Sequence, residues 1–407
     1  MSLFIFGLGL SGQACLTYFS RQGSVLAYND TLTDEQKNAW TQRWPTVTFH
    51  DQTHPPTLTD IYEIIISPGI PLTHPLCQQA QQHGIPIVSD IDYFARHAQA
   101  PIIAITGTNG KSTTTKLVTD LLNGCGKKAL MGGNIGVPVM SLLDEPTPDY
   151  YVLELSSFQL ETTFSLKAFS AALLNISDDH LDRHGDLDTY RTIKERIFID
   201  AQHCVRPEDI IQAQYDHPLA PENLSPSLAG EHNHLNAQAA LALLAPLNLD
   251  PTQLVQGLQG FVGLPHRCEV VGTVNQVTWI NDSKATNVAA TLAAITSLGP
   301  LCSGNLILLV GGVGKGQDFA PLQPAVKQHV DTTIAYGAEG THLANLLNTP
   351  HAPDLRTAIA QAKALAQPGD WVLLSPACAS FDEFKNYAER GQLFCEAIRS
   401  KSHDDTI

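Results

Sequence analysis

The sequence has no long hydrophobic run: no segment approaches the ~18 consecutive apolar residues that a membrane-spanning helix needs. The opening stretch MSLFIFGLGLSG also lacks the basic residues that precede the apolar core of a secretory signal. We therefore expect a cytoplasmic protein that is not inserted in a membrane. With 407 residues, 43% hydrophobic and 16% charged, the chain is typical of a globular protein of two or three domains.

Positive charge is scarce, because 24 Lys and Arg stand against 40 Asp and Glu and leave a net charge of −16. Such a field repels a nucleic-acid backbone, so we expect no nucleic-acid partner, although a nucleotide in a local basic pocket is compatible with it. The eight cysteines are scattered and contain no C-x-x-C pair, which indicates reduced thiols.

Strands and helices alternate along the chain, which predicts an α/β fold with parallel sheets. Expected strands lie at 3–6, 25–28, 61–69, 85–90, 102–106, 151–155, 171–176, 277–281, 305–312, 332–337 and 371–376, with helices at 13–21, 188–199 and 234–247 among others. The proline-rich segment 205–228 is predicted to be a loop or a degenerate subdomain. We place boundaries near residues 93 and 263, giving segments 1–93, 94–262 and 263–407.

The motif G-L-G-L-S-G (7–12) follows a strand and opens a helix, and Asp30 closes the next strand. This order is typical of a nucleotide-type site, since glycines allow a phosphate to approach the backbone at a helix N-terminus. An ordinary tight turn also favours glycine, and the motif does not specify which nucleotide binds.

The segment I-T-G-T-N-G-K-S-T (105–113) predicts a phosphate-binding loop, with Lys111 as the cation and Ser112 as a Mg²⁺ ligand. It departs from the strict Walker spacing, because Ile105 occupies the first glycine position and the loop glycine is Gly107. Glu154 ends a neighbouring apolar strand, where the carboxylate of such a site is expected. The alternative for Glu154 is a satisfied ion pair in the core.

Other polar segments allow more than one interpretation. His180 and His184 have no H-E-x-x-H context, so we reject a structural zinc site and keep a Mg²⁺ contact or a solvated turn. Lys194 lies beside an apolar helical stripe, where a lysine usually reaches out to solvent. The glycine-flanked Lys315 suits a small anion or an ordinary turn, and Cys378 is interpreted as a packing residue.

Six motifs together resemble the Mur ligases in order and spacing: G-T-N-G-K-S-T, E-L-S-S-F-Q-L-E, H-N-x-x-N, P-H-R, N-D-S-K-A-T-N and S-P-A-C-A-S-F-D. The resemblance extends from Phe4 to Phe394. It implies a Rossmann-like N-terminal domain, a P-loop-type central ATP-binding domain and a Rossmann-like C-terminal domain. It also implies an ATP-dependent amide ligase of cytoplasmic peptidoglycan synthesis, most similar to the members that add D-glutamate to UDP-N-acetylmuramoyl-L-alanine. We expect a monomer.

The resemblance also implies site residues. Those implied for ATP are Asn109, Gly110, Lys111, Ser112, Thr113, Asn233, Asn236, His266, Arg267 and Asp282. Those implied for the UDP substrate are Leu10, Ser11, Asp30, Thr31, Ser67 and Asn134, and those for D-glutamate are Thr286, Lys315, Ser380 and Tyr387. Two Mg²⁺ positions are implied, one at Ser112 and Glu154 and one at His180 and a carbamylated Lys194, and the catalytic set is Lys111, Glu154, His180 and Lys194.

Three positions depart from the family pattern. Val313 stands where an acid is expected, Tyr387 stands where an apolar aromatic ring is common, and 205–228 is short. Three other functions stay open at this point: another Mur or folate-polyglutamate-type ligase, a nicotinamide oxidoreductase supported only by residues 7–30, and a non-catalytic nucleotide-gated binding module.

Overall fold

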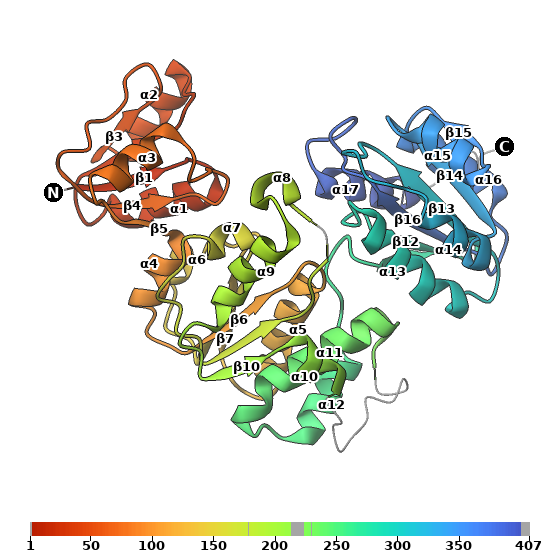
Figure 1. Cartoon of the computed structure of the whole chain (residues 1–407). Coiled ribbons are helices and arrows are strands. Elements are labelled where there is room, and N and C mark those ends of the chain that lie inside the picture. Colours follow the sequence, from red (N-terminus) through yellow and green to blue (C-terminus); the bar gives the residue numbers. More distant parts are fainter. Residues whose placement is uncertain (1, 178, 213–223, 229, 400–407) are drawn as a thin grey trace. The chain divides into compact units, whose positions relative to one another are not determined.

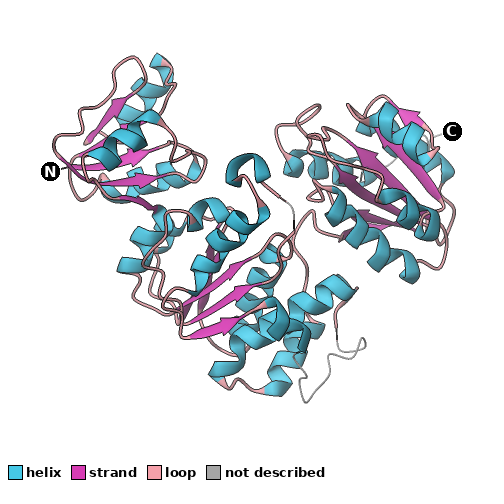
Figure 2. Cartoon of the chain, viewed as in Figure 1, coloured by secondary structure: helices cyan, strands magenta, loops and turns pink. Residues whose placement is uncertain are grey.

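A computed structural model gives the structure of the chain and describes residues 2–177, 179–212, 224–228 and 230–399. The chain divides into two compact units, one of residues 1–218 with 235–258 and one of residues 219–234 with 259–407. The first unit contains two sheets and the second contains one (Figures 1 and 2). No helix within the described ranges combines the length and apolar character needed to cross a bilayer.

The first sheet has five parallel strands in the order β3-β2-β1-β4-β5. Its elements are β1 (Ser2–Phe6), α1 (Leu10–Phe19), β2 (Val25–Tyr28), α2 (Asp34–Arg43), β3 (Val47–His50), β4 (Ile61–Ile66), α3 (Pro75–Gln82) and β5 (Ile87–Ser89). Phe4, Ile5 and Ile64 of the central strands are fully buried, as expected where helices cover a parallel sheet. The strand order is that of a Rossmann-like sheet, which confirms this part of the predicted fold.

The second sheet also has five parallel strands, in the order β10-β9-β6-β8-β7. Its strands are β6 (Ile102–Thr106), β7 (Ala129–Gly133), β8 (Tyr150–Glu154), β9 (Ser170–Leu173) and β10 (His203–Val205). The helices of this region are α4 (Asp90–His97), α5 (Lys111–Gly124), α6 (Val139–Leu142), α7 (Ser157–Leu160), α8 (Leu181–His184), α9 (Leu187–Glu195), α10 (Pro207–Gln212), α11 (Glu231–Leu244) and α12 (Pro251–Gln259). Short 3-10 turns lie at Arg196–Phe198, Pro226–Leu228 and Ala245–Leu247.

Two elements of this region differ from the sequence prediction. The strand expected at 171–176 ends at Leu173, because Asn175 and Ser177 hydrogen-bond to Thr108 instead of continuing in the sheet. The segment 205–228 is not wholly loop: it includes the helix α10 and the turn at Pro226–Leu228, while residues 213–223 lie outside the described ranges.

The third sheet has the order β11-β12-β16-β13-β14-β15. Its strands are β11 (Glu269–Val274), β12 (Val277–Asn281), β13 (Leu306–Gly311), β14 (Thr332–Tyr336), β15 (His351–Ala352) and β16 (Trp371–Ala377), and its helices are α13 (Val288–Leu298), α14 (Leu322–His329), α15 (Gly340–Leu347), α16 (Leu355–Leu365) and α17 (Tyr387–Arg399), with a 3-10 turn at Gly299–Leu301. One apolar cluster includes residues of α16 and α17 and another includes residues of α13, α14 and α15, so helices cover both faces.

The antiparallel edge strand β11 is a feature that the alternating pattern did not predict. It forms a hairpin with β12 through Asn275 and Gln276, whose φ angles are 52° and 61°. Two adjacent residues with positive φ are what a tight two-residue hairpin requires.

Candidate functional site

The three glycines of the first loop have different surroundings. A Cβ atom at Gly12 would lie 1.9 Å from the Gly7 carbonyl oxygen, and one at Gly7 would lie 2.7 Å from Ser67 Cβ. A Cβ at Gly9 meets nothing within 4 Å, and no side chain caps the helix α1 that Gly9 precedes. The outer glycines therefore allow close packing, while the middle one leaves free N–H groups open to an anion.

Most of the other residues predicted for the UDP substrate lie around this loop, whereas Asn134 lies at the second sheet. The Ser67 hydroxyl donates to the Gly7 carbonyl at 2.7 Å, and Leu10 is 74% exposed at the start of α1. The Asp30 carboxylate accepts from Tyr28 Oη at 3.0 Å and lies 3.1 Å from His74 Nε2. Thr31 follows as an exposed residue, and Asn134 lies apart from this loop, after β7.

Ser11 of the same loop lies against a buried carboxyl group. Asp90, the first residue of α4, is 2% exposed, and burial raises its pKa to about 6 although hydrogen bonds from the Ile91 N–H and the Ser11 side chain oppose the shift. The first loop is thus backed by an acid.

The predicted phosphate loop connects β6 to α5. Gly110 adopts a left-handed conformation before the helix, and the Asn109 N–H donates to Asn175 Oδ1 at 2.9 Å while Asn175 Nδ2 donates to the Asn109 carbonyl at 3.1 Å. Through these two hydrogen bonds the side-chain amide of Asn175 pairs with the Asn109 backbone, as the backbone of a neighbouring strand does in a sheet. Asn175 was not predicted as a site residue, since its position after a strand resembles that of any loop asparagine.

Two lysines meet at one carbonyl of this loop. Lys111 Nζ donates to the carbonyl oxygens of Gly107 at 2.9 Å and Thr108 at 2.8 Å, and Lys194 Nζ also donates to the Gly107 carbonyl at 2.9 Å. Lys194 is only 1% exposed, so its interpretation as a solvent-reaching lysine is wrong. Burial and the charge of Lys111 lower its pKa to about 7.

Glu154 lies beside the loop, because β8 pairs with β6 so that Glu154 is opposite Ile105. Its Oε1 accepts from Asn134 Nδ2 at 2.7 Å, whereas its buried Oε2 has no hydrogen-bond partner. The ion-pair alternative for Glu154 is therefore wrong. An orphaned carboxylate oxygen next to a phosphate loop fits a divalent cation, and the Ser112 side chain at the start of α5 supplies an oxygen of the same hard type.

His180 is placed less tightly than the other predicted catalytic residues. Its side chain is 46% exposed, its ring lies 4.8 Å from that of Phe158, and Asp179 is 3.6 Å away. Within the described residues it makes no hydrogen bond to Glu154 or Lys194.

Two further asparagines, Asn233 and Asn236, were predicted for ATP, and Asn236 lies at the loop. Its Oδ1 accepts from Thr114 at 3.4 Å and lies 2.2 Å from where a Cβ of Gly110 would be, so glycine is required there. Asn233 Nδ2 donates to the Ser227 carbonyl at 3.2 Å. Thr113, also predicted for ATP, lies half-buried in the first turn of α5.

The second unit carries the remaining residues predicted for ATP. His266 Nδ1 lies 2.8 Å from Asn281 Nδ2, and burial lowers the pKa of His266. Burial raises the pKa of Asp282 to about 6, while its oxygens accept from Ser375 Oγ at 2.8 Å and the Cys268 N–H at 3.2 Å. Arg267 follows His266 in the P-H-R segment and is half-buried.

The residues predicted for D-glutamate lie at the carboxyl ends of strands in this unit. Thr286 follows β12, Lys315 follows β13, and Ser380 follows β16. Tyr387 begins α17, and its ring lies 3.8 Å from Lys284 Nζ. Val313, one of the departures from the family pattern, pairs with Ala379 through two backbone hydrogen bonds of 2.8 and 2.9 Å. Cys378 is fully buried, which confirms its interpretation as a packing residue.

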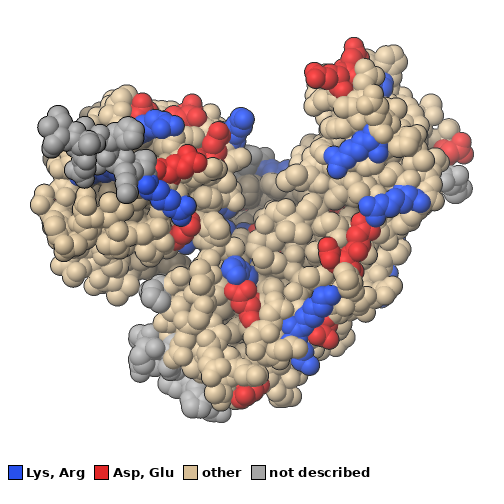
Figure 3. Space-filling view, turned by 180° about the vertical axis from the view of Figure 1, so that it is seen from behind, with Lys and Arg blue, Asp and Glu red and all other residues tan. Residues whose placement is uncertain are grey.

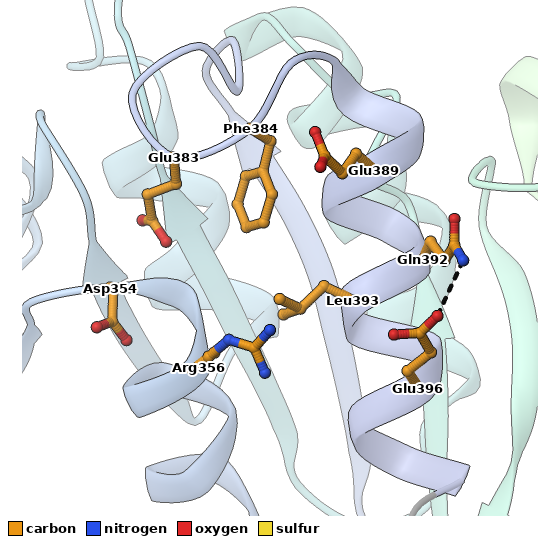
Figure 4. A pocket seen from close by; sticks show the side chains of 8 residues that line it. All are labelled: Asp354, Arg356, Glu383, Phe384, Glu389, Gln392, Leu393 and Glu396. Carbon is orange, nitrogen blue, oxygen red and sulfur yellow. Dashed lines mark hydrogen bonds between the residues drawn. The ribbon is translucent and has the colours of Figure 1, made fainter.

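A separate cavity of about 500 Å³ in the second unit contains none of these residues. Its lining is Asp354, Arg356, Glu383, Phe384, Glu389, Gln392, Leu393 and Glu396 (Figure 4). Four carboxylates against one guanidinium disfavour an anionic ligand. Basic and acidic side chains are also interspersed on the face drawn in Figure 3.

Comparison with protein families identifies the class. The descriptions "Mur ligase MurD-like, N-terminal domain", "Mur ligase middle domain" and "Mur ligase, glutamate ligase domain" match residues 1–89, 105–222 and 266–378. The chain belongs to the Mur ligase family.

Comparison with curated proteins finds relatives that match nearly the whole chain. The UDP-N-acetylmuramoylalanine--D-glutamate ligase of Hahella chejuensis is 42% identical over 97% of this chain and 97% of its own. The enzyme of the same name from Haemophilus ducreyi is 41% identical over 96% of this chain and 95% of its own.

Solved structures share the fold. UDP-N-acetylmuramate-alanine ligase MurC from Thermotoga maritima has a TM-score of 0.60 at 20% identity and covers 97% of this chain and 98% of its own. FolC of E. coli in complex with DHPP and ADP has a TM-score of 0.59 at 20% identity, covering 82% of this chain and all of its own. These likenesses confirm the predicted three-domain α/β architecture.

Proposed function

We propose that this chain is a cytoplasmic ATP-dependent ligase that joins D-glutamate to UDP-N-acetylmuramoyl-L-alanine in peptidoglycan synthesis. The relatives that match it over nearly their whole length carry this activity in their names. In this proposal residues 1–93 bind the UDP substrate, 94–262 bind ATP, and 263–407 bind the amino acid. The protein acts as a monomer.

The observation that carries the proposal is the convergence of Lys111 and Lys194 on the Gly107 carbonyl, beside a buried carboxylate with an unpartnered oxygen. Lys111 and a prospective metal ligand at the start of a helix without a side-chain cap are suited to neutralise a triphosphate, and Lys194 lies at the same carbonyl. A nicotinamide oxidoreductase that binds only its dinucleotide does not need this second phosphate loop, so the oxidoreductase alternative is disfavoured.

In the proposed reaction the carboxylate of the UDP substrate attacks the γ-phosphorus of ATP, and the bond to ADP breaks. The amine of D-glutamate then attacks the acyl phosphate, and phosphate leaves with the electron pair of the C–O bond. Lys111 stabilises the negative charge of the phosphoryl group as it is transferred, while the N–H groups of the loop bind the remaining phosphate oxygens. The residues proposed for the ATP phosphates are Asn109, Gly110, Lys111, Ser112 and Thr113. Those proposed for the nucleoside are Asn233, Asn236, His266, Arg267 and Asp282.

Mg²⁺ fits the donor set at Ser112 and Glu154, where it supplies charge neutralisation to the phosphates when bound. Asn134 keeps the Glu154 carboxylate oriented through its 2.7 Å hydrogen bond. His180 and Lys194 form the second metal position in this proposal.

Lys194 carries a carbamate in the active enzyme. Its lowered pKa, about 7, leaves much of the amine neutral near neutral pH. The nitrogen lone pair attacks CO₂, an N–C bond forms, and the amine loses a proton to solvent. The product is an anion, which relieves the repulsion between Lys194 and Lys111 and offers oxygens to a metal.

The carbamate is tested by ¹³C NMR of the protein in ¹³C-bicarbonate, with the Lys194→Ala variant as the control. A carbamate resonance that is absent from the variant is expected. A spectrum without that resonance, together with full activity of Lys194→Ala, contradicts the carbamate.

The function itself is tested by phosphate release from ATP with a panel of amino acids. We expect release only when UDP-N-acetylmuramoyl-L-alanine and D-glutamate are both present. Equal turnover with L-alanine or a diamino acid contradicts the assignment, and release without any amino acid shows a simple ATPase.

A further inference from the structure

Arg390 of α17 is a fully buried arginine without an ion pair. Its Nε donates to Ser283 Oγ at 3.0 Å, and its Nη2 donates to the carbonyl oxygens of Ser283 at 2.8 Å and Cys378 at 3.0 Å. It is 0% exposed, and its Nη1 has no hydrogen-bond partner. None of the carboxylates in the described ranges forms an ion pair with it.

Such an arrangement is costly for a purely structural residue. A buried charge loses its hydration, and neutral acceptors return only part of that loss, so an unpaired buried cation costs several kcal/mol. The charge of Arg390 opposes the rise in the pKa of Glu383 that burial causes. Its close partners are backbone carbonyls and one hydroxyl.

Its hydrogen-bond partners belong to two separate segments at the carboxyl end of the third sheet, since Ser283 follows β12 and Cys378 follows β16. The backbone of Gly312, which follows β13, packs close to the guanidinium, because a Cβ built there would lie 3.2 Å from Arg390 Nη1. Ser283 Oγ also donates to the Tyr387 carbonyl at 2.8 Å. The guanidinium therefore fixes the relative positions of segments that come from distant parts of the sequence.

Each of these segments carries one of the residues proposed for the amino acid. Thr286 lies three residues after Ser283, and Ser380 lies two residues after Cys378. Lys315 lies three residues after Gly312. The backbone carbonyl of Tyr387 accepts the hydrogen bond from Ser283 Oγ. The segments after β13 and β16 are further joined by the Val313–Ala379 backbone pair.

We propose that Arg390 is a positioning residue that assembles the binding site for an acidic amino acid: its hydrogen bonds join the segments after β12 and β16, and the segment after β13 packs against it. The inference rests on the proposed function for the identity of the amino acid.

The test is steady-state kinetics of Arg390→Met, Arg390→Lys and Ser283→Ala, with the KM of each substrate measured separately. Displacement of the segments is expected to raise the KM for D-glutamate by ~10-fold or more in Arg390→Met, since small misplacements are costly for orientation. Arg390→Lys keeps the charge with fewer donors and is expected to recover part of the loss. Ser283→Ala is expected to show a smaller rise in the same direction. The KM values for ATP and the UDP substrate stay within about 2-fold of the wild-type values.

The matched control is Arg399→Met, which removes an exposed arginine from the last turn of the same helix and leaves all three KM values unchanged. Thermal unfolding of each variant establishes folding. If Arg390→Met does not fold, Arg390→Lys and Ser283→Ala carry the test. An unchanged KM for the amino acid in the folded variants, or an equal rise for all three substrates, overturns the proposal.

The result of the kinetic test of Arg390 can be distinguished from the result of the amino-acid panel that tests the proposed function. The variants are assayed with whichever amino acid the wild-type protein accepts in the panel. Acceptance of an amino acid other than D-glutamate contradicts the proposed function alone, whereas an unaltered KM in the variants contradicts the positioning role alone.

Discussion

The two glycine loops of the first unit use the same backbone device with different ionisable groups behind it. Each follows a parallel strand and precedes a helix without a side-chain cap. The first is backed by the buried acid Asp90, whose pKa burial raises to about 6. The second is backed by the buried Lys194, whose pKa burial lowers to about 7, and carries Lys111 in addition.

This difference separates binding from chemistry. Helix N–H groups alone suffice to hold a nucleotide that does not react. Phosphoryl transfer places further charge on the oxygens, and preorganised cations stabilise it. We therefore propose that the transferred phosphate binds at the second loop and that the first loop binds a group that does not react.

The largest effect is expected from Lys111→Ala. The change removes the cation that follows the phosphoryl group and packs no core, so we expect kcat to fall by ~10³-fold or more with little change in thermal unfolding. Phosphate release measures it. The control is Lys116→Ala on the same helix, which removes the lysine of an i,i+4 ion pair with Asp120. Near-normal kcat in a folded Lys111→Ala variant contradicts the assignment of the second loop.

Glu154→Gln is expected to be the next largest. Glutamine retains an oxygen for Asn134 but loses the charge that a divalent cation needs, so we expect a higher Mg²⁺ requirement and a loss of ~10²-fold in kcat at low Mg²⁺. A Mg²⁺ titration of activity measures this shift. The exposed Glu145→Gln is the control, and an identical Mg²⁺ curve for both variants refutes a metal at Glu154.

The first loop is tested by paired glycine changes. Gly12→Ala places a Cβ 1.9 Å from the Gly7 carbonyl and is expected to destabilise the protein by about 2 kcal/mol or more, seen as a lower midpoint in urea. Gly9→Ala meets no neighbour and has a permitted φ of −70°, so the midpoint should hold. Gly9→Ala should instead raise the KM for the UDP substrate by ~10-fold without changing that for ATP, since a Cβ keeps the phosphate from the backbone. Equal midpoints for the two variants contradict this division of roles.

The last prediction concerns Asp90 and affects the pH dependence of stability rather than activity. Its folded pKa of about 6 lies above the unfolded value of 3.8, so the protonated form is favoured by folding. Stability from this group is therefore present below pH ~4 and is lost as the pH rises through 6, by ~3 kcal/mol at most. We expect Asp90→Asn to unfold at a higher temperature than the wild type at pH 7.5 and at nearly the same temperature at pH 4. A difference that is independent of pH shows that Asp90 does not titrate in this range.

Spacing along the chain was enough to predict both loops, since a strand, a glycine turn and a helix are contiguous in sequence. It could not decide whether Lys194 faces solvent, because a lysine next to an apolar stripe occupies the edge of the helix and only packing against Thr106 and Gly107 fixes its direction. Arg390 was missed although a signal exists: it lies four residues before Phe394 and eight before Ile398, both buried, which places it on the buried face of α17.

The most direct test of the account follows ¹⁸O from the carboxylate of the UDP substrate. If the second loop transfers the γ-phosphoryl group to that carboxylate, the phosphate released with D-glutamate contains one oxygen from the substrate. The account predicts one ¹⁸O atom in each phosphate when both carboxylate oxygens are labelled. Phosphate that takes its new oxygen from water instead shows ATP hydrolysis without an acyl phosphate and contradicts it.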